Sequence, residues 1–203
     1  MLEGLKIVLL VFFLTLLFSI PLAILVTFLR LNRLKLISSL TNLYILLMRG
    51  TPLLLQLIVI YYGLPLIGIT FDRFDCAIIA FTLNYTAYFA EIFRGGLQSI
   101  DRGQFEASKV LGFTPQTMYL RIIFPQVIKR ILPSLANEVI TLIKDTSLVY
   151  ILGLNDILRV AQIASNRELS LFPLFEVGLI YLLMIAVLSK LFAKLEAHYT
   201  YYR

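Results

Sequence analysis

Two groups of polar and charged side chains interrupt long apolar runs of this chain. The first group is Asn84, Tyr85 and Thr86, and the second is Glu138, Thr141, Lys144 and Asp145. Charge is expensive to bury in an apolar medium, so such groups face a protein interior or a wet cavity where counter-charges can meet them. Glu138, Thr141 and Asp145 follow the i, i+3, i+7 spacing of one helix face. These residues could bind an ion or a zwitterion.

A structural role for the same charges is the competing interpretation. Glu138 or Asp145 could pair with a basic neighbour only to hold helices together. Glu91 has such a neighbour in Arg94, three residues further along a helix. For Arg49, extension of the side chain toward the cytoplasmic interface is favoured over a role in substrate binding.

The elements that would position these side chains are membrane spans. The chain has 203 residues, 60% of them hydrophobic, and a mean hydropathy of +0.89, which exceeds that of an ordinary soluble domain. A span needs roughly 20 apolar residues. Five segments meet this approximately: 7–29, 52–69, 76–97, 133–154 and 171–195. Lipid leaves an open chain only the helix for pairing its backbone groups, so residues 1–203 are predicted to form one all-α integral membrane domain with five transmembrane helices.

Local signals predict where these helices begin and end. Pro21 is expected to interrupt the first span. A helix start, with a threonine cap and a proline at the first position, is predicted at Arg49, Gly50, Thr51 and Pro52. Asp75 is expected to cap the third span. Gly153, followed by the pair 155–156, predicts that one helix ends here and that a short helix begins, on the outer face.

The net charge of +6 does not indicate nucleic-acid binding, because the basic residues cluster beside the spans. The clusters are Arg30, Arg33 and Lys35; Arg94, Arg102, Lys109, Arg121, Lys129 and Arg130; and Lys190, Lys194 and Arg203. Cytoplasmic loops carry an excess of Lys and Arg. Five spans with these clusters inside place the N-terminus outside and the C-terminus in the cytoplasm.

Enzymatic and metal chemistry find no support in the sequence. The single cysteine, Cys76, and the single histidine, His198, cannot supply a Cys-rich or His-rich metal site. There is no G-x-x-x-x-G-K-[ST] phosphate loop, so any ATP hydrolysis is expected on another chain. The N-terminus is interpreted as a retained span and not as a signal peptide.

A polar loop at about 99–125 predicts two short helices joined at Gly112. Asp101 can cap the first helix, with Gln104 closing a capping box. Gly112 can supply the left-handed residue that ends it. Thr114 and Pro115 then begin the second helix. This shape fits a cleft on a partner, although a helical hairpin lying on the membrane surface for its own stability is equally compatible.

The loop resembles the coupling-loop signature E-A-A, x3, G, x9, I-x-L-P of ATP-binding-cassette (ABC) importer permeases. The corresponding positions here are Glu106, Ala107, Ser108, Gly112, Ile122 and Pro125, and the chain departs from the pattern at Ser108 and Phe124. Two further stretches, 49–56 and 87–96, resemble the polar amino acid branch of that family, and the downstream stretch 132–134 adds to the resemblance. The resemblance covers most of the chain beyond the first span.

The resemblance implies a type I importer permease fold in a bacterial or archaeal cell membrane. It further implies two cytoplasmic ATPase subunits that hold ATP and Mg, with the coupling loop seated in a groove on each. A second permease subunit, identical or paralogous, and an external amino acid binding protein complete the assembly, and this chain itself holds no cofactor.

The function expected is that of the membrane-spanning subunit of an importer for polar amino acids. Away from their ends, the spans hold three acidic residues, Glu91, Glu138 and Asp145, against one basic residue, Lys144. Surplus negative charge favours arginine, lysine or histidine as substrate, with glutamine as the competitor. The alternative is an ion-coupled carrier or channel that uses the same charges as a relay.

Overall fold

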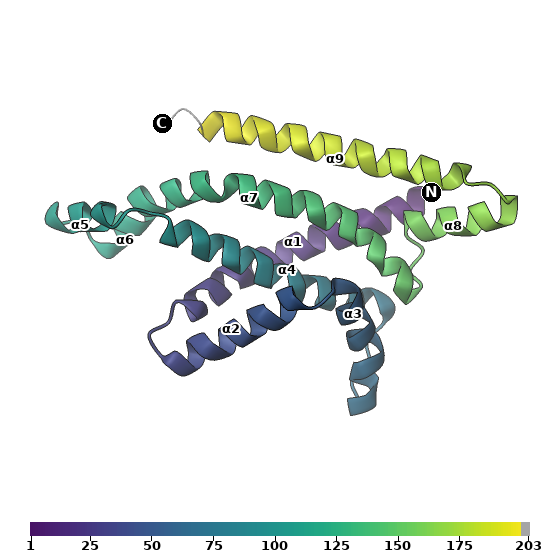
Figure 1. The fold of residues 1–203 in the computed structure, drawn as a ribbon, viewed down its shortest axis with the longest axis horizontal. Helices are drawn as coiled ribbons and strands as arrows, with labels where there is room; N and C mark the ends of the chain where they lie inside the picture. Colours follow the sequence, from purple (N-terminus) through teal and green to yellow (C-terminus); the bar gives the residue numbers. More distant parts are fainter. Residues whose placement is uncertain (200–203) are drawn as a thin grey trace.

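The computed structural model describes residues 1–199, and all regular secondary structure in this range is helical (Figure 1). The α-helices are α1 (Leu2–Arg30), α2 (Lys35–Gly50), α3 (Leu53–Ile58), α4 (Arg73–Gln98), α5 (Arg102–Val110), α6 (Pro115–Thr117), α7 (Phe124–Asp145), α8 (Ile157–Glu168) and α9 (Phe172–Tyr199). π-Helical segments fill Val59–Gly63 and Met118–Ile123, and 3₁₀ segments fill Leu64–Ile67 and Thr146–Leu152. Arg203, which the charge pattern assigns to the cytoplasm, lies outside the described residues.

Three of these helices, α1, α4 and α9, are individually long and apolar enough to cross a membrane. Two bent pairs also meet the requirement, and they bring the count of candidate spans to five within residues 1–199. One pair joins α2 to the segment Leu53–Ile67 at 105°, and the other joins Pro115–Leu152 to α8 at 58°. The all-α fold expected from hydropathy is therefore confirmed, and the two bent pairs are the candidates for the second and fourth spans.

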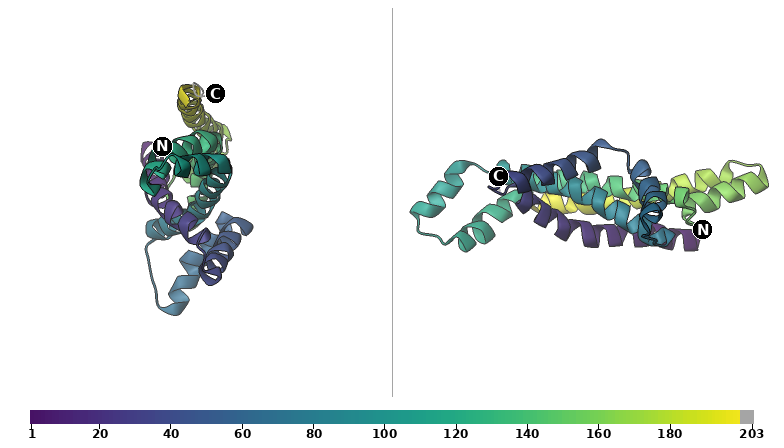
Figure 2. Two further views of the ribbon diagram at one scale, coloured as in Figure 1. Left: turned by 90° about the vertical axis from the view of Figure 1, so that its left-hand side faces the viewer. Right: turned by 90° about the horizontal axis from the view of Figure 1, so that it is seen from below.

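The centre of the molecule is the contact between α1 and α4, which cross near the middle of the bundle (Figures 1 and 2). The buried face of α1 carries mostly small or branched residues that include Val11, Thr15, Ser19, Ala23 and Thr27. Small side chains let helix backbones approach closely in a membrane. Pro21 is exposed on the other face, and α1 continues through it. The prediction that Pro21 interrupts the span is wrong, since α1 is one helix from Leu2 to Arg30.

The break between α2 and α3 has a different cause from the one the sequence indicated. Thr51 does not cap α3; its hydroxyl donates back to the carbonyl of Leu47 at 2.7 Å. The amide of Gln56 instead donates to the carbonyl of Met48 at 2.9 Å and to the Thr51 hydroxyl at 2.8 Å. Asn84 adds a bond to the same Met48 carbonyl at 3.0 Å. These amides replace the helical partners that the turn at Pro52 removes.

The N-termini of α4 and α8 are both capped by aspartates. Asp72, and not Asp75, caps α4, since its carboxylate accepts the N–H of Asp75 at 2.8 Å. Asp156 caps α8 through the N–H groups of Leu158 and Arg159, each at 3.1 Å. Gly153 takes a left-handed φ of 80°, which ends the preceding segment as predicted.

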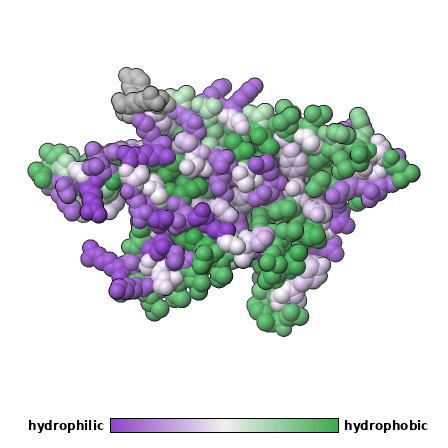
Figure 3. All heavy atoms as spheres, viewed as in Figure 1, coloured by the Kyte–Doolittle hydropathy of each residue, from purple (hydrophilic) through white to green (hydrophobic). Residues whose placement is uncertain are grey.

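The ends of the bundle differ in chemical character. Helices α5 and α6 form one end, where α9 also finishes, whereas α1 begins near α8 at the other end (Figure 1). Hydrophilic residues gather over the α5–α6 end, and hydrophobic residues cover the projecting segment that follows α3 (Figure 3). Leu66 and Ile67 at the tip of that segment are 87% and 71% exposed.

Candidate substrate cavity and coupling helices

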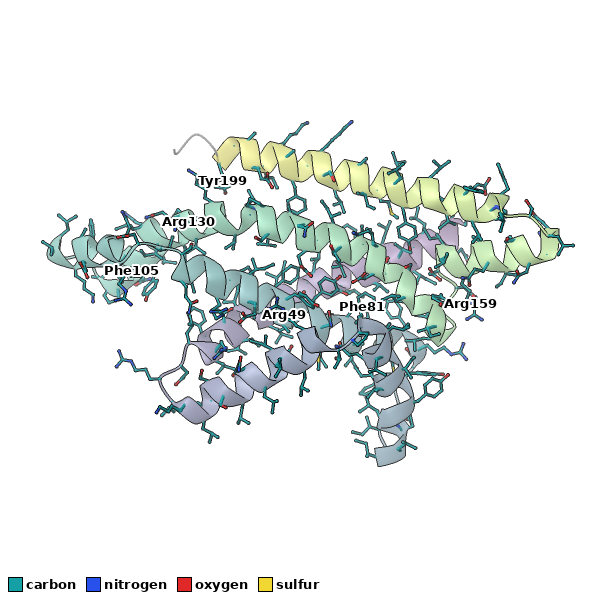
Figure 4. All side chains as sticks on the ribbon, in the orientation of Figure 1. Arg49, Phe81, Phe105, Arg130, Arg159 and Tyr199 are labelled. Atoms are coloured by element: carbon teal, nitrogen blue, oxygen red, sulfur yellow. The ribbon has the colours of Figure 1, made fainter. Side chains whose placement is uncertain are left out.

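A cavity of about 540 Å³ opens beside the break between α2 and α3, where α4 and α7 face it. Its lining consists of Arg49, Gly50, Thr51, Pro52, Leu53, Leu54, Asn84, Tyr85, Tyr88, Glu138, Thr141, Asp145 and Leu148. The residues of the predicted helix-start motif are therefore cavity walls, and they come together with polar residues of α4 and α7. Arg49 and Phe81 mark this region in Figure 4.

One face of α7 supplies the acidic wall of the cavity. Glu138, Thr141 and Asp145 all line it, as their helical spacing predicts. The Tyr85 hydroxyl donates to Oδ2 of Asp145 at 2.7 Å. Tyr85 is 1% exposed and stacks on Phe81 with ring centroids 6.3 Å apart, so its hydroxyl is held in place. The carboxylate of Asp145 is thereby oriented and keeps one oxygen for a ligand.

Arg49 supplies the positive side of the cavity. Its guanidinium lies over the Tyr88 ring, 5.2 Å from the centroid, and 3.7 Å from Oε2 of Glu91. Glu91 is already held by Arg94 through bonds of 2.8 and 2.6 Å, as its i+3 spacing predicts. Arg49 therefore lines the cavity while its side chain stays 43% exposed, and its extension toward the cytoplasmic interface stays a prediction.

Two of the seven predicted path residues lie elsewhere. Thr86 is buried against α1, where its hydroxyl lies 3.5 Å from the carbonyl of Ser19. Lys144 lines a separate pocket of about 510 Å³ with residues of α8 and α9 that include Tyr181. Consecutive helical residues point roughly 100° apart, which separates Lys144 from its neighbour Asp145. The count of charges made from the sequence therefore changes: Lys144 does not line the Asp145 cavity, whereas Arg49 does.

Sequence reasoning gave no role to two residues of this region. Gln56 closes the α2–α3 break, and its Oε1 accepts from Asn84 at 3.0 Å. Tyr88 carries the guanidinium of Arg49 on its ring. A lone amide in the apolar run that follows Pro52 is a signal that could have identified Gln56, because such a group must find a partner in lipid.

The loop predicted to dock on a partner folds as a short helix followed by a tight turn. Asp101 caps α5 by accepting the N–H of Gly103 at 2.7 Å, while the Gln104 side chain accepts from Gln126 instead of closing a capping box. Gly112 has a φ of 71°. The N–H of Gly112 donates to the Lys109 carbonyl, and the N–H of Phe113 donates to the Ser108 carbonyl. These two bonds form a glycine cap at the C-terminus of α5.

The second helix begins as predicted but does not remain short. Thr114 caps it by accepting the N–H of Thr117 at 3.3 Å, with Pro115 at its first position. It then continues through the π-helical segment Met118–Ile123 into α7. α5 and the following turn are thus mechanically joined to the helix that carries Glu138 and Asp145.

The signature residues occupy both sides of this hairpin. Glu106, Ala107, Gly112 and Pro125 are exposed, Ile122 is half-buried, and Ser108 is 3% exposed with its hydroxyl on the Gln104 carbonyl at 2.6 Å. Val110 and Leu111 stand out at 88% and 70% exposure. Two exposed apolar residues at the tip of a polar hairpin are typical of a protein contact. Among residues 1–199, no group of three or more metal-ligating side chains comes together.

Comparison with known proteins gives one consistent result. The model of the family described as binding-protein-dependent transport system inner membrane component matches residues 7–201. The chain is 37% identical over 190 residues to the arginine transport system permease protein ArtQ of Bacillus subtilis (strain 168), across 93% of this chain and 87% of that protein. A crystal structure of an amino acid ABC transporter with histidines superposes with a TM-score of 0.89 at 35% identity, across 97% of this chain and 92% of that chain.

The same fold recurs at lower identity. An inward-facing structure of the MetNI methionine ABC transporter superposes with a TM-score of 0.74 at 16% identity, across 97% of this chain and 93% of that chain. The all-helical fold of this chain is thus that of an ABC importer permease. The chain belongs to the family of binding-protein-dependent transport system inner membrane components, as a permease subunit of an amino acid importer.

Proposed function

We propose that the cavity beside the α2–α3 break carries amino acids with a cationic side chain. The observation that supports this proposal is the charge of the lining: two carboxylates, Glu138 and Asp145, stand on one face of α7, and the guanidinium of Arg49 comes from the end of α2. An amino acid such as arginine carries two positive groups and one negative group. Each of its charges would find a counter-charge in the cavity, as buried charges require.

In this proposal, Arg49 binds the α-carboxylate, and the two carboxylates bind the α-amino group and the cationic side chain. Arg49 is available because Arg94 already neutralises Glu91 through two shorter bonds. A volume of about 540 Å³ is within the usual range of small-molecule sites. The similarity to a permease named for arginine transport, and to a transporter solved with histidines, agrees with this substrate class.

The proposed assembly has two ATPase subunits that hold ATP and Mg, a second permease subunit, and an external binding protein. α5 and its exposed tip contact the ATPase, and α7 transmits the movement to the cavity. The chain lies in a bacterial or archaeal cell membrane, with its N-terminus outside and its C-terminus in the cytoplasm. The placement of the basic residues supports that orientation.

Uptake of labelled arginine, glutamine and glutamate by the reconstituted complex tests the substrate proposal. Wild type should prefer arginine. Asp145→Asn should lower the arginine preference about tenfold or more, because a charge-assisted hydrogen bond contributes about 1.5–3 kcal/mol. Arg49→Gln should lower the uptake of all three substrates, since each has an α-carboxylate.

Lys144→Gln is the matched control, because this charge neighbours Asp145 in sequence but lies outside the cavity. Its substrate preference should equal that of wild type. Preferred uptake of glutamate by wild type, or an unchanged preference in Asp145→Asn, would contradict the proposal.

A further inference from the structure

Two arginines converge at the end of the bundle opposite the coupling helices. A Cβ placed on Gly153 would lie 2.7 Å from Nη1 of Arg73 and 2.9 Å from Nη1 of Arg159. Both guanidinium groups therefore reach one point from different helices, α4 and α8. Their hydrogen-bond acceptors are neutral and distant: the Tyr61 hydroxyl at 3.4 Å for Arg73 and the Tyr150 carbonyl at 3.5 Å for Arg159.

Two carboxylates next to these arginines in sequence are engaged by backbone N–H groups and not by the guanidinium groups. Asp72 uses its side chain to accept the N–H of Asp75, and Asp156 accepts two N–H groups at the start of α8. Within residues 1–199, neither Arg73 nor Arg159 forms an ion pair with a carboxylate. Asp72 and Asp156 are thus held as helix caps, and among the described residues the two guanidinium groups have no carboxylate within ion-pair distance.

Helix stability does not account for either arginine. Arg73 is the first residue of α4, and Arg159 is the third residue of α8. A positive charge in the first turn opposes the helix dipole, which favours anions at that position. The two like charges also repel each other. Gly153 leaves the space between them open, and its left-handed φ of 80° is one that glycine adopts without strain.

The position of the pair connects it to the substrate cavity. The 3₁₀ segment Thr146–Leu152 begins directly after Asp145 and ends directly before Gly153. Arg159 lies at the far end of the molecule from Phe105 and Arg130, which belong to the coupling region (Figure 4). In the proposed orientation this end faces the outside of the cell, where an external binding protein delivers substrate.

We propose that Arg73 and Arg159 together bind a carboxylate of the external binding protein and so form its docking point above the substrate path. Arginine forks match a carboxylate with two parallel hydrogen bonds, and two forks around an open point fit one acidic side chain. The partner is a protein and not a lipid, because the site lies at the outer end of the segment that leads into the cavity. This inference rests on the proposed orientation and on a binding-protein-dependent importer.

The test measures ATP hydrolysis by the complete complex in nanodiscs as substrate-loaded binding protein is added. The double variant Arg73→Glu with Arg159→Glu should raise the half-saturating concentration of binding protein about tenfold or more, because rim charges govern association. Arg73→Gln with Arg159→Gln should give a smaller rise. In wild type, this concentration should rise with salt, and in both variants that salt dependence should weaken.

Arg167→Glu is the matched control, because this exposed arginine of α8 already pairs with Glu168 at 3.3 Å. It should leave the half-saturating concentration unchanged. An unchanged value in the charge-reversed double variant overturns the proposal, and so does an effect confined to nanodiscs with anionic phospholipid, which would assign the site to lipid phosphate. The proposal is also overturned if the double variant loses as much ATP hydrolysis with free arginine in the absence of binding protein as it does with loaded binding protein. The ratio of arginine to glutamine uptake tests the cavity separately.

Discussion

The Tyr85 hydroxyl donates to Oδ2 of Asp145 across the interface between α4 and α7, at 2.7 Å. This bond turns the carboxylate toward the cavity and occupies one of its oxygens. Tyr85→Phe would keep the aromatic ring and its stacking on Phe81. We expect KM for arginine to rise about tenfold, since a hydrogen bond to a charged group contributes about 1.5–3 kcal/mol, with little change in thermal stability. Equal KM values in the two proteins would show that Tyr85 does not position Asp145.

Gly50 keeps the cavity open beside Arg49. A Cβ on Gly50 would meet no atom within 4 Å, and the residue lines the cavity. Gly50→Leu should therefore fold and insert normally, while the added side chain occupies ligand space and weakens arginine binding at least about tenfold. Gly50→Ala is the smaller control and should retain most of the affinity. Isothermal titration with the purified complex gives both values, and undiminished affinity in Gly50→Leu would place the ligand elsewhere.

Adjacent glycines of α4 should respond oppositely to substitution. A Cβ on Gly96 would collide with Cγ2 of Ile131 and lie 3.0 Å from Cγ1 of Val127, whereas a Cβ on Gly95 would meet nothing within 4 Å. Gly96→Ala should lower stability by about 1–3 kcal/mol, the usual cost of overpacking. Gly95→Ala should be neutral or slightly stabilising. The measurement is the thermal unfolding midpoint of the two variants in the same detergent. Equal midpoints would contradict the close packing of α4 on α7.

Gly112 ends α5 in a conformation that other residues adopt with strain. Its φ is 71°, and its N–H donates to the Lys109 carbonyl at 3.0 Å. Gly112→Pro removes that donor and cannot adopt the angle, so the tip of the hairpin must change shape. We expect normal insertion and cavity binding but loss of ATP-driven uptake, and Glu106→Lys should have the same effect if this exposed acid faces the ATPase. Full uptake by both variants at normal expression would remove the coupling role.

Orientation in the membrane is testable with fused reporters. A reporter placed after Arg203 should behave as cytoplasmic, and one inserted near Asp72 should behave as external, because the basic clusters lie at the other end of the spans. The reverse result would reject the proposed topology. It would also remove the basis for a docking point at Arg73 and Arg159, without affecting the charges of the cavity.

Several local features of the chain were predicted correctly from the sequence alone. Hydropathy identified the spans, Gly112 and Thr114 marked the ends of the coupling helices, and the spacing of Glu138 and Asp145 put them on one helix face. Each of these depends only on a few neighbouring residues or on the helical repeat, so the sequence alone determines it.

Tertiary structure decided which charges meet. The 105° bend after α2 brings Arg49 into the cavity, and the rotation of α7 about its axis turns Lys144 away from it. Asp72 and Asp156 look in sequence like partners for the neighbouring arginines, yet their use as caps leaves Arg73 and Arg159 to converge on Gly153. Such pairings depend on helix directions and rotations set by packing over the whole bundle, and no local pattern records them.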